Sequence, residues 1–195
     1  MEGRRDHIVS ATIDCMTRLG VVNTSLTDVC TEAGISRGAL YTHFTSKEEI
    51  LCAVMDRIGE QAIVITSFEN VGELRQHLEG HIRSIASGEL NALAHIELDV
   101  LVAARSSEPL RESYERAIRQ RQQNFEKRLK KLVLAGDVLP ETDPRTAATA
   151  ILGFMSGTFI NMAATGLPVA AHIAALRSIL SIVLPPSQPR TKVSR

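Results

Sequence analysis

The chain has 195 residues, and its 22 lysines and arginines balance 22 aspartates and glutamates, so it carries no net charge. This length permits one large or two small domains and buries roughly 70% of the unfolded surface, so the fold needs no disulfide to stabilise it. Three cysteines without C-x-x-C spacing exclude a disulfide framework and match reduced thiols. The N-terminus is polar and no apolar run approaches the roughly 20 residues that cross a bilayer, so we expect a cytoplasmic protein.

Residues 26–47, LTDVCTEAGISRGALYTHFTSK, predict two short helices joined by a tight turn. Ser25 is placed to cap the first helix and Ser36 the second, while Gly34 can take the left-handed backbone conformation that ends the first. Cys30 falls where the helices cross and a small side chain is needed. The inward faces carry apolar residues at helical spacing: Leu26, Val29, Ala33, Ile35, Leu40 and Phe44. Helix pairs of this kind enter the groove of DNA.

A supporting helix precedes this pair and a long helix follows it. The supporting helix is expected from the apolar residues between Ile8 and Leu19, and it ends at Gly20. The long helix opens with Ser46-Lys47-Glu48-Glu49, the pattern of a capping box, and its apolar residues continue to Ile65.

Residues 8–51, IVSATIDCMTRLGVVNTSLTDVCTEAGISRGALYTHFTSKEEIL, closely resemble the DNA-binding head of the tetracycline-repressor (TetR) family of bacterial regulators. Residues 33–51 match the usual signature of that family nearly residue for residue. Met16 and Val21 depart from it, because aromatic residues are commoner there, but both remain apolar. The resemblance implies that the DNA backbone is contacted by Thr27, Tyr41, His43 and Lys47. It also implies that the base sequence is read by Arg37, Gly38 and Thr42.

Charge alone does not predict DNA binding here. Up to residue 50 the chain has five basic residues and seven acidic ones, so binding to random DNA should be weak and specific contacts must be placed individually. The helix N-termini at Ser36 and Ser46 can offer backbone N–H groups to phosphate, and Ala39 faces away from the apolar side. The candidate DNA-binding residues are therefore Thr27, Ser36, Arg37, Gly38, Ala39, Tyr41, Thr42, His43 and Lys47. The alternative is that Tyr41 and His43 only brace the head.

The remaining sequence predicts an all-α protein. Helices are expected over the five segments 71–87, 90–105, 109–135, 144–165 and 168–184, and no strand pattern competes. We therefore expect a helix-turn-helix DNA-binding domain over residues 1–46 and a helical ligand-binding and dimerisation domain over residues 47–184. Residues 185–195 have no apolar periodicity and are expected to be a disordered tail.

The segment 90–105, LNALAHIELDVLVAAR, is apolar on almost every face, which predicts a helix buried on all sides. Its acids Glu97 and Asp99 then need partners. One alternative is an internal ion pair with an arginine between Arg111 and Arg128. The other is a pocket for a cationic or hydrogen-bonding ligand, with the candidate residues Met55, His95, Glu97, Asp99, Phe154, Met155 and Phe159.

Small residues crowd the segment 144–165, where Gly153 and Gly157 lie on one helical face. They permit close packing, either within the chain or across a homodimer of four helices, and the resemblance implies the dimer. His77 and His81 stand one helical turn apart, but no third ligand is fixed by the sequence, so we expect no metal site. The eight basic residues between Arg111 and Lys131 are expected to form a solvated helix face.

The sequence lacks a G-x-S-x-G motif, a phosphate-binding loop and a dinucleotide fingerprint, so we expect neither an enzyme nor a cofactor. The function expected is a homodimeric, ligand-responsive transcription regulator, foremost a repressor, that a small molecule releases from a palindromic double-stranded DNA operator. The alternative is a constitutive DNA-binding regulator without a small-molecule ligand.

Overall fold

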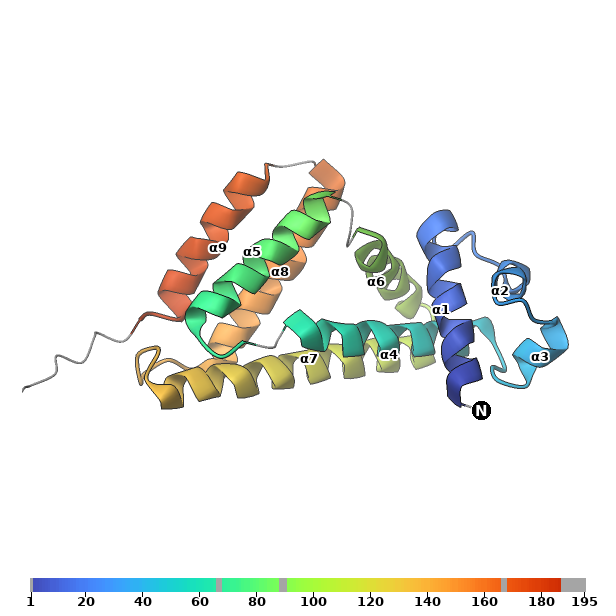
Figure 1. Ribbon diagram of the computed structural model, residues 1–195, viewed down its shortest axis with the longest axis horizontal. Helices are drawn as coiled ribbons and strands as arrows, with labels where there is room; N and C mark the ends of the chain where they lie inside the picture. The colour runs from blue at the N-terminus through green and yellow to red at the C-terminus, as the bar shows by residue number, and fades with distance from the viewer. Residues whose placement is uncertain (1, 66–67, 88–90, 166–167, 187–195) are drawn as a thin grey trace, which may run out of the picture. The chain divides into compact units, whose positions relative to one another are not determined.

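The computed structural model describes residues 2–65, 68–87, 91–165 and 168–186, and this part of the chain is helical, as predicted (Figure 1). Its helices are α1 (Glu2–Leu19), α2 (Leu26–Glu32), α3 (Arg37–Tyr41), α4 (Lys47–Ile65), α5 (Val71–Ser87), α6 (Asn91–Ala104), α7 (Glu108–Ala135), α8 (Pro144–Thr165) and α9 (Val169–Val183). The five segments predicted after residue 70 match α5 to α9 to within one residue at each end.

Local chemistry sets these helix ends. Gly20, Gly34 and Gly136 have φ angles of 79°, 61° and 80°, the left-handed conformation that was predicted for Gly34 and that also ends α1 and α7. Ser25 forms a complete capping box with Asp28, since its hydroxyl accepts from the Asp28 N–H at 3.2 Å and its own N–H donates to the Asp28 carboxylate at 2.8 Å. Asp143 caps α8 in a similar way, accepting from the Thr146 N–H at 3.1 Å.

The capping box predicted at the start of α4 is only half formed. The Ser46 hydroxyl accepts from the Glu49 N–H at 3.1 Å, as expected. The Glu49 carboxylate, however, accepts from the Thr45 N–H at 2.8 Å and the Thr45 hydroxyl at 2.9 Å, one residue before the predicted partner. Thr45 offers both its backbone N–H and its hydroxyl, so it outcompetes the single backbone N–H of Ser46. These two hydrogen bonds lower the pKa of Glu49.

The described residues form two compact units, each with its own core. Unit 1 contains residues up to 62 and residues 91–121, and unit 2 contains residues 63–87 and 122–186, so α7 contributes to both. In unit 1, α1 to α4 and α6 surround a core that includes Ile8, Leu40, Phe44, Met55 and Val100, all fully buried.

The expectation that the segment 90–105 is buried on all sides is wrong. Ile96 and Val100 of α6 are buried in unit 1, but Leu101 is 39% and Val102 65% exposed. The apolar character surrounds the helix, whereas unit 1 covers only one face of it.

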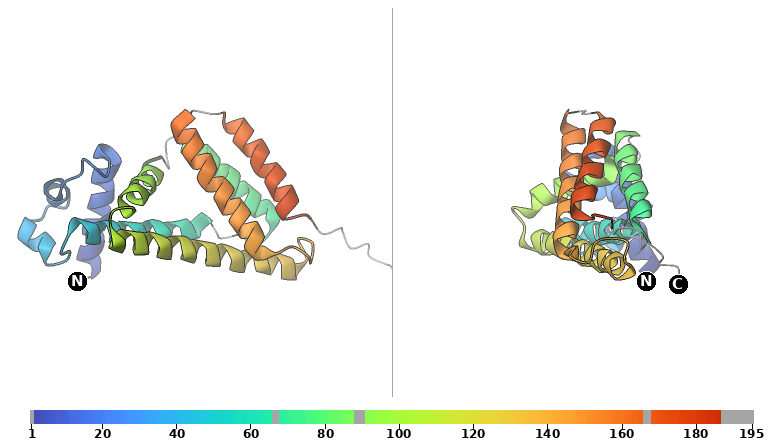
Figure 2. Two further views of the ribbon diagram at one scale, coloured as in Figure 1. Left: turned by 180° about the vertical axis from the view of Figure 1, so that it is seen from behind. Right: turned by 90° about the vertical axis from the view of Figure 1, so that its left-hand side faces the viewer.

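In unit 2, α5, α8 and α9 lie side by side (Figures 1 and 2). The rings of Phe68 and Phe125 meet edge to face at 5.6 Å and join the C-terminal part of α7 to the start of α5. Pro185 and Pro186, the first two residues of the predicted tail, pair with the loop after α7, where the Leu139 N–H donates to the Pro185 carbonyl at 2.9 Å. The rest of the predicted tail lies outside the described residues.

Candidate nucleic-acid interface

The helix pair α2 and α3 has a buried and an exposed side (Figure 1). Leu40 and Phe44 are fully buried, and Val29 and Cys30 of α2 are buried beside them, so the predicted packing role of Cys30 is confirmed. Ser36 caps α3 with its hydroxyl, which accepts from the Ala39 N–H at 3.1 Å. The inward face is thus fixed by apolar contacts, and the outward face remains available to a partner.

The candidate DNA-binding residues lie between the start of α2 and the start of α4 and differ in exposure. The exposed members are Thr27, Ser36, Arg37, Gly38, Tyr41 and Thr42, and the partly exposed ones are Ala39, His43 and Lys47. Tyr41 is 51% exposed, so its ring contributes little to the core and the bracing alternative does not describe it. The Thr42 hydroxyl donates to the Ala39 carbonyl at 2.7 Å and keeps its oxygen free to accept.

Arg5 is a residue of the head that sequence reasoning missed. Its guanidinium donates to the His43 carbonyl at 2.7 Å, pairs with Glu49 at 3.3 Å and lies 4.1 Å from the centre of the Phe44 ring. It therefore binds the first turn of α1 to the segment that follows the recognition helix α3. No local signal marks this role, because Arg5 and His43 are 38 residues apart.

Internal contacts occupy most of the positive charge of the head. Arg5 is engaged as described, Arg18 pairs with Glu32 at 2.5 Å, and the Lys47 ammonium donates to two backbone carbonyls. Within the described residues, Arg4 and Arg37 make no hydrogen bond or ion pair, and both are exposed. Of the residues predicted to read bases, Arg37 is thus the one that offers an uncommitted cation.

Lys47 is the candidate whose surroundings differ most from the expectation. Its Nζ donates to the Val21 carbonyl at 3.2 Å and to the Thr24 carbonyl at 2.6 Å. Two of the three N–H groups of the ammonium therefore hold the turn between α1 and α2.

The acids of α6 have partners inside unit 1. Glu97 forms a forked ion pair with Arg121, with N–O distances of 3.1 and 3.3 Å, which confirms the predicted internal pairing. Asp99 accepts a hydrogen bond of 3.4 Å from the Val21 N–H. Of the other ligand candidates in this unit, Met55 is fully buried and His95 is exposed.

The remaining ligand candidates lie in unit 2. Phe154 lines a hollow of about 330 Å³ between α8 and α9, together with Thr158, Asn161, His172 and small residues. The Thr158 hydroxyl is 2% exposed and has no hydrogen-bond partner among the described residues. Met155 belongs to the core of unit 2, and Phe159 is half-buried. The predicted ligand residues are thus divided between the two units.

The match to known proteins is strongest over this head. Residues 8–54 match the model of the bacterial regulatory proteins of the tetR family. The head of the chain, residues 8–54, therefore belongs to the TetR family. It is 38% identical to the transcriptional regulator TtgR of Pseudomonas putida over 56 residues, which are 29% of this chain and 27% of TtgR, so the match spans about a quarter of that relative.

Solved structures of the family resemble nearly the whole chain. GusR of Salmonella enterica superposes with a TM-score of 0.76 at 22% identity over 93% of this chain and 95% of its own. A transcriptional regulator from Saccharomonospora viridis in complex with choline gives 0.75 at 19% identity over 94% and 98%. At these identities the likeness establishes the TetR fold, with its helix-turn-helix head and helical core.

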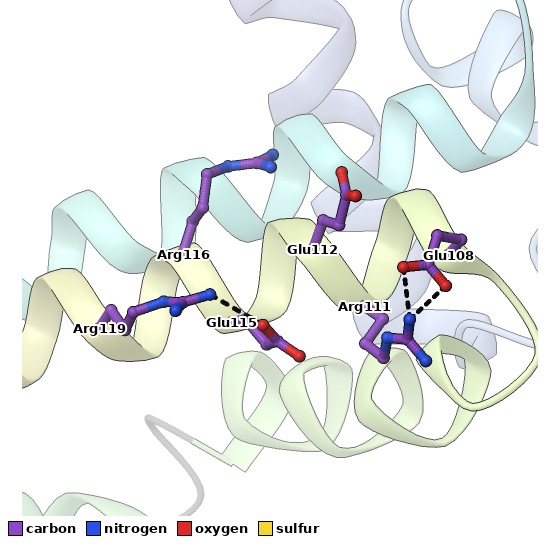
Figure 3. Close-up of a pocket in the computed structure, with 6 residues that line it drawn as sticks. All are labelled: Glu108, Arg111, Glu112, Glu115, Arg116 and Arg119. Carbon is purple, nitrogen blue, oxygen red and sulfur yellow. Dashed lines mark hydrogen bonds and ion pairs between the residues drawn. The ribbon is translucent and has the colours of Figure 1, made fainter.

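The N-terminal part of α7 carries charged side chains of both signs (Figure 3). A hollow of about 370 Å³ is lined by Glu108, Arg111, Glu112, Glu115, Arg116 and Arg119. All six come from one helix and are exposed, Arg111 pairs with Glu108, and Arg119 pairs with Glu115 at 2.8 Å. These exposed residues are part of the solvated helix face predicted for residues 111–131, whereas Arg121 of the same run is mostly buried and pairs with Glu97.

Other chemistry in the described residues is sparse. Burial raises the pKa of the Cys15 and Cys52 thiols, which keeps them protonated and poorly nucleophilic near neutral pH. Among the described residues, no group of three or more His, Cys, Asp or Glu is arranged to hold a metal ion. None of the described helices is long and apolar enough to span a membrane.

Proposed function

We propose that this protein is a DNA-binding transcription regulator that acts as a homodimeric repressor and is released from its operator by a small molecule. The observation that carries the proposal is the outward side of α2 and α3, where the candidate residues gather around an uncommitted Arg37. Membership of the TetR family supports it.

In this proposal α3 enters the major groove of the operator. Arg37, Gly38, Ala39 and Thr42 face the base edges, and the guanidinium of Arg37 is suited to guanine. Phosphates are contacted by Thr27, Ser36, Tyr41 and His43, whereas the Lys47 ammonium already donates to the Val21 and Thr24 carbonyls. Because the head has more acidic than basic residues, these directed contacts must supply affinity that general charge attraction does not.

The glycines of α8 support a dimer through α8 and α9. No described atom outside the immediate surroundings of its own helix lies within 4 Å of a Cβ built at Gly153 or Gly157. Packing among the described residues therefore gives no reason for glycine at either position. On α9, Ile182 is 76% exposed, and the exposed residues before it include the small Ala171, Ala174 and Ala175. A second copy could approach closely on such a surface.

The proposal includes a response to a small-molecule effector. The fold neighbour in complex with choline supports a small-molecule ligand. A cationic ligand would meet the acids of α6, but it would have to displace Arg121 from Glu97 or the Val21 N–H from Asp99. The other candidate ligand residues are Met55, His95 and Glu97 in unit 1 and Phe154, Met155 and Phe159 in unit 2. The alternative is a constitutive regulator without an effector.

Selection from a random duplex library tests the proposal. Purified protein should enrich an inverted repeat whose half-sites lie about 34 Å apart, one helical turn of DNA. Choline, added first as the probe and followed by a panel of small cations and neutral aromatics, should reveal an effector as a compound that both raises the melting temperature and lowers affinity for the selected repeat. A coupling of about 1–3 kcal/mol would change that affinity ~5–150-fold. Binding that no compound alters would favour the constitutive regulator.

A further inference from the structure

The turn between α1 and α2 is held from two sides at a single residue. Val21 is 4% exposed, and both polar groups of its backbone have side-chain partners. Its N–H donates to the Asp99 carboxylate of α6 at 3.4 Å, and its carbonyl accepts from the Lys47 ammonium of α4 at 3.2 Å. These partners are 78 and 26 residues away in sequence, so neither contact is an accident of local geometry.

The turn also has hydrogen bonds of its own, from the Thr24 hydroxyl to the Gly20 carbonyl at 2.7 Å and from the Asn23 side-chain amide to the Leu19 carbonyl at 3.0 Å. Gly20 leaves α1 with a φ angle of 79°, and the Thr24 N–H donates back to the Gly20 carbonyl at 3.1 Å. Thr24 is 1% exposed, and its carbonyl accepts a second N–H from Lys47 at 2.6 Å. The ammonium thus joins the two ends of the turn, one residue before the Ser25 cap that starts α2.

We propose that Lys47 and Asp99 are positioning residues for operator binding: together they grip the Val21 peptide and thereby fix where α2 begins relative to α4 and α6. The proposal rests on the DNA-binding function proposed above and deepens it. It assigns the Lys47 ammonium to the protein interior rather than to a phosphate, and it gives Asp99 a role in the head rather than in recognising an effector.

Removing the Asp99 carboxylate gives a clear test, because its electrostatic effect and its proposed positioning role would change the affinity for DNA in opposite directions. Loss of an acid from a DNA-binding protein raises affinity for DNA, or leaves it unchanged where salt screens the charge. Loss of a hydrogen bond that positions the head lowers it. We expect Asp99→Ala to weaken operator binding about 3- to 10-fold, the loss typical of one hydrogen bond. Asp99→Asn, whose amide oxygen can still accept from the Val21 N–H, should stay within about twofold of wild type.

Lys47 is tested by the dependence of binding on salt. A residue that neutralises one phosphate reduces the slope of log affinity against log salt by about one when it is removed. We expect Lys47→Ala to weaken operator binding with no change in that slope, and Lys47→Arg to restore much of the affinity. Glu112→Ala and Lys130→Ala remove one exposed charge of each sign from α7 and serve as matched controls.

One readout is independent of DNA. Amide hydrogen exchange at Val21, followed by NMR, should be at least about threefold faster in Asp99→Ala than in wild type or Asp99→Asn. If the wild-type protein selects no operator, the proposed function is wrong. The exchange rate at Val21 still tests whether Asp99 holds the Val21 N–H. If Asp99→Ala binds the operator as tightly as wild type or more tightly, or if Lys47→Ala lowers the salt slope by about one, the positioning roles are wrong.

Discussion

The head and the C-terminal helices present opposite kinds of surface. The outward side of α2 and α3 is polar and carries the uncommitted Arg37. The exposed residues of α8 and α9 include Ile160 at 46%, Ile182 at 76% and several small residues. A polyanion is the partner that suits the first surface, and a second apolar surface is the partner that suits the other. One chain therefore carries two surfaces that suit different partners, and a substitution can affect one surface without affecting the other.

Matched losses of a buried phenylalanine should have the largest effects and separate the two regions. Phe44 and Phe125 are both fully buried, one in each core. Either substitution by alanine should cost about 3–5 kcal/mol in the free energy of unfolding. Phe44→Ala should abolish operator binding and leave a dimer in sedimentation, whereas Phe125→Ala should also dissociate the dimer. Equal loss of dimer in both variants would show that the regions are not independent.

A larger side chain on α8 should stabilise the folded chain slightly but destabilise the proposed dimer. Gly153→Gln improves helix propensity by about 0.5 kcal/mol, and its Cβ meets no described atom within 4 Å apart from its own helix backbone. Across the proposed dimer it should cost about 1–3 kcal/mol for each copy through overpacking. Sedimentation should then show monomers that melt no lower than dilute wild type. Gly80→Gln, on α5 and equally open, is the control that should stay dimeric. An unchanged dimer in Gly153→Gln would place the seam elsewhere.

Acid should weaken unit 2 through Glu79. This carboxylate is 8% exposed and accepts from Arg177 at 2.7 and 3.1 Å and from Arg83 at 3.0 Å, which lowers its pKa, with the Arg177 hydrogen bond as the largest cause. Because the folded pKa is depressed, the stabilisation is complete above the ordinary glutamate pKa of about 4.3 and is lost as pH falls through the folded value.

Glu79→Gln should therefore cost about 1–3 kcal/mol near neutral pH and flatten the pH dependence of unfolding below about pH 4.3. Chemical denaturation from about pH 3 to about pH 7, a range that spans that pKa, measures both effects. Glu115→Gln removes an exposed partner of Arg119 and should change neither. A variant at Glu79 with the acid sensitivity of wild type would assign that sensitivity to other groups.

The smallest effect is expected from the caps. Ser25→Ala removes the hydroxyl half of the capping box of α2, keeps the backbone half and should cost about 1 kcal/mol. Because α2 is part of the proposed DNA surface, operator affinity should fall with it. Thr146→Ala, next to the cap of α8, should leave operator affinity unchanged because it lies in unit 2. The comparison needs melting curves and binding isotherms for both variants.

Contacts between residues that are close in the sequence could be predicted, and contacts between residues far apart in the sequence could not. The helix ends at Gly20 and Gly34 and the caps at Ser25 and Ser36 were predicted, since each depends on neighbours within a few residues. The contacts of Arg5 with His43 and of Asp99 with Val21 were not, because they join residues 38 and 78 positions apart.

The apolar composition of a segment led to a wrong prediction of its burial, because burial depends on which other helices pack against it. The segment 90–105 is apolar around its whole circumference, yet Val102 of α6 is 65% exposed. The pairing of Glu97 with an arginine of α7 was one of two alternatives, because the sequence shows that a buried acid needs a partner but not which group supplies it.

The central claim, that two copies of this head read one operator, is tested most directly by a hydroxyl-radical footprint of the selected duplex, with the stoichiometry measured in the same samples. The account predicts two protein chains on each duplex and two protected segments of equal sequence, related by inversion and about 10 base pairs apart. Arg37→Ala should lose protection at the same position in both segments. A single protected segment with one bound chain, or uniform protection that does not depend on sequence, would contradict the claim.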